Sequence, residues 1–287
     1  MYPAKFDYVA PSTLDEALKL LAEGGGDAKL LAGGHSLLPM MKLRLAEPAK
    51  LIDLRRVPGL NEIKVEPSGI TIGAMVTHAQ VASSPEIKRA LPLLAEAEER
   101  VGDLQVRNRG TVGGSLAHAD PAGDLPAVFL ALEGEVVARG PRGERTIKAA
   151  DFFVDILTTA LAEEEIITQV RFPALAPRTG TSYQKFDHPA SHYALTGVAA
   201  VATLGSGGSI ERVRVGVTGV GPKAYRAEGV EQALAGKGGD AVRAAADKAA
   251  DGIDCNDDIH ASAEYRAHLA RVFTRRALEE AIQRAGG

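Results

Sequence analysis

The sequence predicts an α+β fold, because short strand-like and helix-like segments follow one another along the chain. Three observations indicate this. Residues 29–54 have the pattern of a strand, a helix and a second strand, residues 198–218 that of a β-hairpin, and residues 262–284 that of an amphipathic helix. Hairpins and separate helices within one chain are typical of this fold class.

The first sixty residues predict a helix followed by a compact strand–helix–strand unit. Capping hydroxyls, early acidic residues and an apolar stripe define the helix, and three glycines end it. In order, we expect a helix at 12–23, a strand at 29–32, a helix at 36–45 and a strand at 51–54. Pro58 and Gly59 then mark a seam between two subdomains near residues 57–60.

The middle of the chain predicts further strands around a broken helix. Ser84 and Pro85 form a helix start, and Pro92 predicts a kink or break before residue 101. The strands expected here lie at 69–75, 133–139, 144–148 and 165–172, the second and third forming a hairpin.

The last part of the chain predicts a separate domain. The segment at 174–180 has the composition of a linker. Beyond it we expect strands at 182–186, 198–204 and 210–218 and helices at about 228–235, 238–250 and 262–284.

Bulk composition excludes several classes of protein. The chain has 287 residues, 45% of them apolar, and a formal net charge of −4, so neither nucleic acid nor an anionic membrane surface is an expected partner. No apolar run reaches the roughly 18 residues of a membrane span, and no signal peptide is recognisable. The expectation is a cytoplasmic protein, with peripheral contact at the inner face of a membrane left open.

Redox centres built from protein ligands are also excluded by composition. The single cysteine, Cys255, cannot hold an iron–sulfur cluster, which takes about four thiolates. The seven histidines form no tight metal-ligand pattern, and no metal ligand is expected on this chain. Any redox chemistry here would therefore need an organic cofactor.

Two glycine-pair loops are the strongest functional signal. They are Ala32-Gly33-Gly34-His35-Ser36 and Thr111-Val112-Gly113-Gly114-Ser115, and each follows an apolar stretch that has the pattern of a strand. Paired glycines let a backbone approach a ligand closely, and the serines offer hydroxyl hydrogen bonds. A helix after the first loop would point its free N–H groups at an anion. A lone glycine pair more often marks a simple turn, so the two loops together carry the prediction.

Charged and polar residues surround the second loop. Arg107 and Arg109 add positive charge, and the backbone of residues 112–115 is expected to supply N–H donors to an anion. Asp120 and Asp124 follow, and a carboxylate beside an anion-binding loop suggests contact with sugar hydroxyls or an amide. This set favours a nucleotide over free phosphate; the alternative is a glycine-rich loop beside a solvated acidic turn.

Other functional motifs fit less well. Neither loop has the GxGxxG of a Rossmann fold, and the chain has no GxxxxGK[ST] and no GxSxG motif. His35 beside Ser36 does not make a nucleophile–base pair, because adjacent residues rarely face each other. Asp254, Asp257 and Asp258 lack the spacing of a calcium loop, and they indicate a solvated turn.

The motifs AGGHSLLPMMKLRLA, NRGTVGGSLAHADPAGDLPA, YQKF and HYALTGVAA together identify a family. They resemble the FAD-binding medium subunit of molybdenum hydroxylases, in the branch of the carbon monoxide dehydrogenase type, over essentially the whole chain. Many relatives have asparagine where this chain has Ser115, which still offers a donor and an acceptor. The xanthine dehydrogenase branch has a first loop without the histidine, which places this chain in the other branch.

The resemblance implies a fold and a set of cofactor-binding residues. Residues 1–176 would form a FAD-binding domain like that of vanillyl-alcohol oxidase (the PCMH type), made of two α+β subdomains. Residues 177–287 would add a small domain with a three-stranded antiparallel sheet and a helical bundle. The two loops would hold the pyrophosphate and Tyr193 would lie by the isoalloxazine ring. Further FAD contacts implied in this way are Thr77, Asp120, Asp124, Ile167 and Lys185.

The resemblance also implies an electron-transfer role without a catalytic acid or base. A large subunit with a molybdenum cofactor would oxidise a substrate, and two [2Fe–2S] clusters on a small subunit would pass electrons to FAD here and on to an external acceptor. The complex would be a dimer of heterotrimers acting on carbon monoxide, an aldehyde, a purine or an N-heterocycle. The alternatives are a stand-alone FAD-dependent oxidase or reductase and a non-catalytic nucleotide-binding assembly protein.

Overall fold

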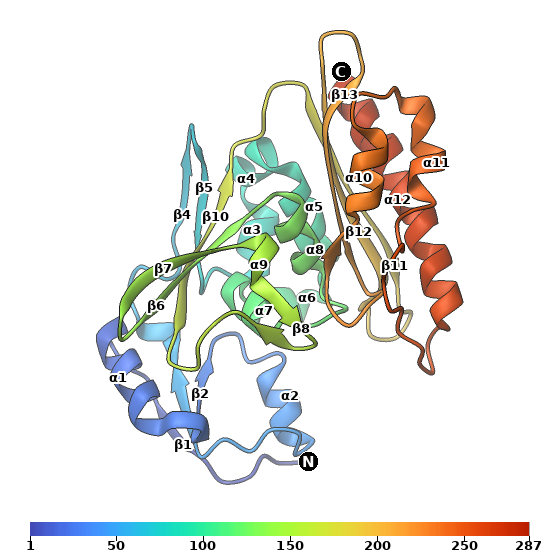
Figure 1. Cartoon of the computed structure of the whole chain (residues 1–287). Helices are drawn as coiled ribbons and strands as arrows, with labels where there is room; N and C mark the ends of the chain where they lie inside the picture. Colours follow the sequence, from blue (N-terminus) through green and yellow to red (C-terminus); the bar gives the residue numbers. More distant parts are fainter. Residues whose placement is uncertain (287) are drawn as a thin grey trace.

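Three successive sheets organise the chain, and the computed structural model describes residues 1–286 (Figure 1). The first sheet is parallel, in the order β1-β3-β2. Its strands are β1 (Asp7–Val9), β2 (Ala28–Leu31) and β3 (Lys50–Asp53), with helices α1 (Leu14–Gly24) and α2 (Leu37–Lys42) and short 3₁₀ turns at Gly25–Asp27 and Leu54–Arg56. Helix α2 connects β2 to β3, so the predicted strand–helix–strand unit is confirmed.

The second sheet is antiparallel, in the order β4-β5-β10-β6-β7. The long strand β10 lies at its centre and pairs with both β5 and β6. The strands are β4 (Ile63–Glu66), β5 (Gly69–Gly73), β6 (Glu135–Gly140), β7 (Gly143–Lys148) and β10 (Ile166–Pro173). Helix α9 (Ala149–Phe152) and a two-stranded ribbon of β8 (Phe153–Asp155) and β9 (Thr158–Thr159) follow β7.

A group of short helices fills the space between the second sheet and the third (Figure 1). These are α3 (His78–Ser83), α4 (Pro85–Ala90), α5 (Pro92–Arg100), α6 (Leu104–Arg109), α7 (Val112–His118) and α8 (Asp124–Ala131). Proline at the first position of both α4 and α5 explains the break, because a proline there needs no N–H partner. All eight residues of α8 are buried, since this helix has protein on every side.

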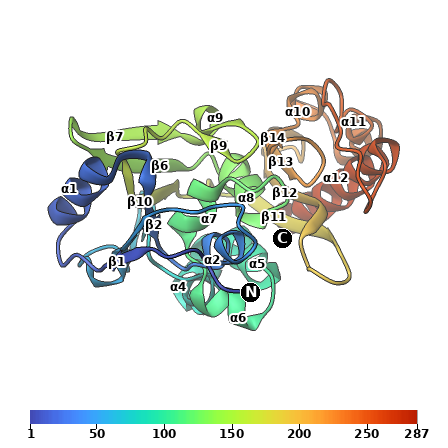
Figure 2. The same cartoon turned by 90° about the horizontal axis from the view of Figure 1, so that it is seen from below.

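The third sheet lies at the C-terminal side of the molecule and is covered by helices on one face (Figures 1 and 2). Its strands are β11 (Thr179–Asp187), β12 (Ala194–Leu204), β13 (Ile210–Thr218) and the two-residue β14 (Tyr225–Arg226). The helices are α10 (Glu228–Leu234), α11 (Val242–Ala246) and α12 (Ala263–Gly286), with a 3₁₀ turn at Gly239–Ala241.

Helix α8 packs directly on the other face of this third sheet. A Cβ atom placed on Gly216 of β13 would lie only 2.0 Å from the carbonyl oxygen of Ala127 of α8, so the two backbones touch. At the end of α8, Glu133 accepts a 2.8 Å hydrogen bond from Arg214 of β13 and another from Arg212. The third sheet is therefore joined to the rest of the chain through α8.

Most elements lie where the sequence predicts them, with a few differences. The third sheet has a short fourth strand beyond the three expected, and residues 238–250 form a 3₁₀ turn, α11 and further turns in place of one helix. The second glycine loop does not follow a strand: it follows α6 and forms the start of α7, so that prediction is wrong. Helices α6, α8 and α9 and strands β1, β4, β8 and β9 were not predicted. Among residues 1–286, no helix is both long and apolar enough to cross a membrane.

Candidate functional site

The two glycine loops lie against each other, although about 75 residues separate them in sequence. A Cβ atom added to Gly33 would stand 2.2 Å from the carbonyl oxygen of Arg109 and 2.7 Å from the Cα atom of Gly110. One added to Gly114 would stand 3.5 Å from the Cβ atom of Ala32. Only glycine permits this contact at position 33, so the structure brings both loops into one continuous backbone surface.

The first loop offers unpaired backbone donors. It begins at the end of β2, turns at Gly34 with a φ of 77°, and enters α2 after Ser36. The His35 ring folds back, with Nδ1 3.1 Å from the carbonyl oxygen of Gly33. Within residues 1–286, the N–H groups of residues 34–37 have no protein acceptor. Several free N–H groups in one turn form a concave site for an anion.

The second loop uses its backbone donors inside the protein. The four N–H groups of residues 112–115 donate, in order, to the carbonyls of Val76 and Ala74, the hydroxyl of Thr111 and the carbonyl of Thr111, at 3.0, 2.9, 3.1 and 2.9 Å. The prediction that this backbone donates to a bound anion is therefore wrong. These bonds fix the loop onto the segment that leads into α3. A bridge between Thr77 and Thr111 extends the same attachment.

Hydroxyl groups remain as the donors that the second loop can offer. Thr111 accepts from the Gly114 N–H and keeps its own hydroxyl hydrogen. Ser115 is half-buried on the first turn of α7 and makes no side-chain hydrogen bond within the described chain. Thr77, in contrast, donates to Gln80 and accepts from the Gln80 N–H in a capping box, so its hydroxyl is engaged at the start of α3.

Asp124 lies in a buried polar cluster with two residues of β11. Its carboxylate accepts hydrogen bonds from the Tyr183 hydroxyl at 2.5 Å and from Lys185 Nζ at 3.0 Å. Lys185 also donates to the carbonyl of Arg100 and lies 3.4 Å from Asp187. Burial raises the pKa of Asp124 to about 6, against the attraction of Lys185. Lys185 is thus held by protein partners, and its contact with a nucleotide stays a prediction.

Asp120 and Tyr193 line a cavity of about 260 Å³ that is bounded by the turn before α8, the segment from β11 to β12 and residues 258–266. The Tyr193 ring is 46% exposed, and burial of its hydroxyl together with the neighbouring Asp120 raises its pKa to about 12. The phenol is therefore neutral at physiological pH. Asp120 also accepts from the Ala122 N–H at 2.9 Å. An open aromatic ring beside a cavity can stack on a planar ligand.

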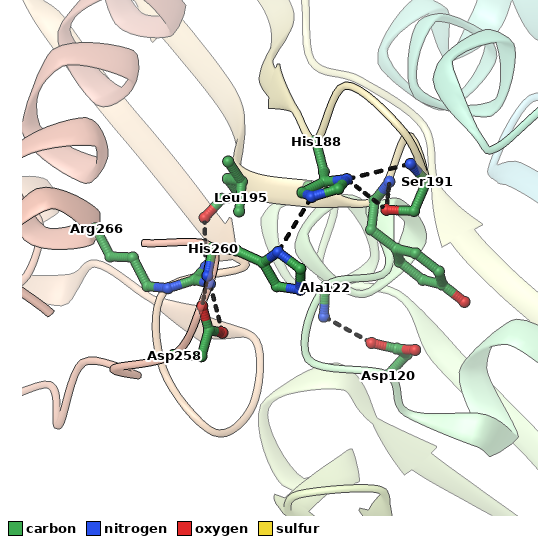
Figure 3. A pocket seen from close by; sticks show the side chains of 10 residues that line it. Asp120, Ala122, His188, Ser191, Leu195, Asp258, His260 and Arg266 are labelled. Carbon is green, nitrogen blue, oxygen red and sulfur yellow. Dashed lines mark hydrogen bonds and ion pairs between the residues drawn. The ribbon is translucent and has the colours of Figure 1, made fainter. Parts of the chain in front are cut away.

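The other wall of this cavity holds a histidine pair and an ion pair (Figure 3). His188 Nε2 lies 3.1 Å from His260 Nδ1, and the N–H groups of Ala190 and Ser191 donate to His188 Nδ1. Since Nδ1 of His188 accepts, its Nε2 carries the hydrogen and donates to His260. Arg266 pairs with Asp258 at 2.7 Å on the far side.

The predicted residues fall into three groups in space. The loops and Thr77 are contiguous, Asp120 and Tyr193 share the cavity, and Asp124 and Lys185 pair with each other. Ile167 is a buried core residue of β10, next to a bulge in its pairing with β6. Sequence reasoning missed Tyr183, although the alternation in YQKF places it on the same face of β11 as Lys185. Among residues 1–286 there is no group of three or more His, Cys, Asp or Glu side chains that could hold a metal ion.

The geometry fits a bound dinucleotide. The joined loops form a surface of glycine backbone with free N–H groups on one side and two hydroxyls on the other, which is what a pyrophosphate needs. The space that a Cβ of Gly33 would need is taken by the backbone of Arg109 and Gly110, which leads into the second loop, so the packing of the loops and access of a phosphate both depend on Gly33. A half-exposed tyrosine lies by a cavity suited to a planar ring. The fold and site define a flavoprotein that binds FAD.

Comparison with known proteins gives the family. Residues 4–175 match the model of the FAD binding domain in molybdopterin dehydrogenase, and residues 181–281 match that of the CO dehydrogenase flavoprotein C-terminal domain. The chain belongs to the family of FAD-binding medium subunits of molybdenum hydroxylases, in the carbon monoxide dehydrogenase type, and is an oxidoreductase subunit. The resemblance drawn from the motifs is thereby confirmed.

Several relatives match over nearly their full length. The carbon monoxide dehydrogenase medium chain of Hydrogenophaga pseudoflava is 44% identical, covering 99% of both chains. A 6-hydroxypseudooxynicotine dehydrogenase complex subunit alpha of Paenarthrobacter nicotinovorans is 40% identical, covering 99% of this chain and 97% of that protein. Among solved structures, the Hydrogenophaga carbon monoxide dehydrogenase matches with a TM-score of 0.96 at 45% identity, and quinoline 2-oxidoreductase from Pseudomonas putida 86 with 0.93 at 33%, each covering 99% of both chains.

Proposed function

We propose that this chain carries FAD as the electron-transfer subunit of a heteromeric molybdenum hydroxylase. It receives electrons from [2Fe–2S] clusters on a small subunit and passes them to an external acceptor. The observation that carries the proposal is the joined pair of glycine loops in a chain that belongs to the medium-subunit family. With a single cysteine, the chain cannot hold such a cluster itself, which supports a separate source of electrons.

The residues of this chain would bind and orient the cofactor. Residues 34–37 would donate backbone N–H groups to the pyrophosphate, and Thr111 and Ser115 would donate hydroxyls to it. Tyr193 would lie against the ring system. When bound, FAD supplies the exchange of electrons between one-electron and two-electron carriers. No acid or base on this chain is required for that exchange.

The assembly and domain organisation are part of the same proposal. The partners would be a large subunit with the molybdenum cofactor and a small [2Fe–2S] subunit, in a dimer of heterotrimers. A FAD-binding domain would span 1–176 and a C-terminal domain 177–287, which is supported by the start of β11 at Thr179 and by the two family matches. A cytoplasmic location stays a prediction from the sequence. Substrate identity would belong to the large subunit.

The test is reconstitution of the chain with FAD, alone and with its small subunit. We expect visible flavin absorbance bands in the isolated chain. On reduction of the clusters in the complex, those bands should bleach at a rate that depends on the small subunit. A chain that stays colourless with excess FAD would contradict the proposal. Turnover of a small organic substrate by the isolated chain would instead support a stand-alone oxidase or reductase.

A further inference from the structure

A buried histidine–glutamate pair lies directly behind the junction of the two glycine loops. His78, the first residue of α3, is 4% exposed, and Glu98 of α5 is 0% exposed. The His78 Nδ1 atom lies 2.5 Å from Glu98 Oε2. Within the described residues, the other carboxylate oxygen of Glu98 has no hydrogen-bond partner, so His78 is what holds this buried group. Burying two ionisable groups costs desolvation free energy, so a buried pair of this kind suggests a role beyond stability.

The opposite edge of the imidazole faces Gly110, the residue immediately before the second glycine loop. A Cβ atom placed on Gly110 would lie 2.7 Å from His78 Cδ2 and 3.0 Å from Nε2. The His78 backbone N–H donates to the Gly110 carbonyl at 3.1 Å. Gly110 in turn contacts Gly33 of the first loop. The order in space is therefore Gly33, then Gly110, then the His78 ring, then Glu98.

This order gives the pair a direction. The carboxylate is on the Nδ1 side, away from the loops, and the ring edge with Nε2 is on the loop side. A charged pair in this arrangement presents its positive end to the junction of the loops. Little water can screen it, because both side chains are buried. The second loop has no free backbone N–H groups at residues 112–115, so a positive charge behind it would supply attraction that its backbone does not.

We infer that His78, charged and held by Glu98, is a positioning residue that fixes the second glycine loop and attracts the pyrophosphate of FAD to the junction of the loops. The inference rests on the proposed FAD site. It does not require His78 to touch the cofactor. Its action is through Gly110 and through the field of the pair.

The surroundings of His78 support the charged form. Glu98 raises the pKa of His78 above its ordinary value of 6.5, although burial opposes this, and Asp124 of α8 raises it further. The other helices packed on α3 carry Glu86, Lys88 and Arg89 on α4 and Arg107 and Arg109 on α6, and the side chains of Arg89 and Arg109 have no hydrogen-bond or ion-pair partner within residues 1–286. On α4, Lys88 pairs with Glu99 at 2.8 Å, and on α6, Arg107 donates to the carbonyl of Val101 at 3.0 Å.

The test compares FAD affinity across pH in the full-length chain. The variants are H78N, which keeps a donor near the Nδ1 position without a charge, and E98Q, which leaves His78 buried without a counter-charge. The matched control is H268N, an exposed histidine on α12. Dissociation constants would be measured by flavin fluorescence from about pH 6 to about pH 9, which spans the titration of a histidine.

We expect wild type and H268N to lose FAD affinity as pH rises through the pKa of His78. H78N and E98Q should bind about tenfold more weakly at the acid end of the range and show a flat pH profile. The ³¹P signals of FAD bound to wild type should shift with the same pH dependence, a measurement that requires no variant to fold. Thermal unfolding would verify that the variants are folded.

Two sets of results would overturn the inference. The first is FAD affinity and ³¹P signals of the wild-type protein that do not change with pH. The second is folded H78N that binds FAD as tightly as the control at every pH. A wild-type chain that binds no FAD at all is a different result, because it would contradict the proposed function itself.

Discussion

Lys185 of β11 places its Nζ atom 2.9 Å from a carboxylate oxygen of Asp124, at the start of α8. The two residues lie in different family matches, 4–175 and 181–281. The lysine side chain is wholly buried, so the pair is shielded from solvent. It therefore ties the segment after the second glycine loop to the third sheet.

Replacing Lys185 by methionine should destabilise the protein by about 3 kcal/mol, because it leaves the buried Asp124 without its cation. Lys148→Met is the matched control, since Lys148 is exposed at the end of β7. Urea unfolding of both variants measures the difference. Equal stability of the two would show that the buried pair contributes nothing.

Asp124 should give the protein a specific pH dependence. Its pKa is about 6 in the folded chain against 3.8 for the unperturbed group. Because the folded value is the higher one, its stabilising contribution is fully present below pH 3.8 and is lost as pH rises through about 6. The loss amounts to about 3 kcal/mol. Urea unfolding at several pH values, for wild type and D124N, should show this slope only in the wild type; parallel profiles would refute it.

Gly33→Ala should weaken FAD binding by about tenfold or more, because the new methyl group would collide with the Arg109 carbonyl and separate the loops. Gly26→Ala is the control, since a Cβ there meets nothing within 4 Å. Fluorescence quenching of titrated FAD gives both affinities. If the two variants bind FAD equally well, the loop junction is not the cofactor site.

Tyr193→Leu should increase the fluorescence of bound FAD, because an electron-rich phenol stacked on a flavin quenches its emission. Tyr2→Leu is the control, since Tyr2 is 87% exposed near the N-terminus. Emission spectra of the FAD-loaded variants measure the effect. Unchanged emission in Tyr193→Leu would place the ring system away from this side chain.

The sequence predicted the elements better than it predicted the contacts between them. The glycine loops were found because their spacing and hydroxyls are local features. The contact between the two loops could not be predicted, because it depends on how Gly33 and Arg109 meet in the folded chain. The sequence predicts a loop after a strand where α7 begins, because valine and the two glycines are poor helix formers. The cap of Thr111 and two bonds to the preceding segment override that preference.

Helix α8 shows a second reason for a missed element. Its residues are almost all apolar, so they lack the period by which an amphipathic helix is recognised. Pro126 near its start also argues against a helix, although proline is tolerated in the first turn. The hydrogen bonds of Asp124 to Tyr183 and Lys185 could not be predicted either, because these side chains reach the carboxylate only when α8 packs on the third sheet.

The burial of α8 on every side has a consequence for engineering. A chain cut near residue 176 would leave this helix with an apolar face in one fragment and expose the matching face of β12 and β13 in the other. Neither fragment is then expected to remain in solution by itself. Chimaeras between members of this family should exchange α8 together with the sheet on which it packs, or exchange the chain whole.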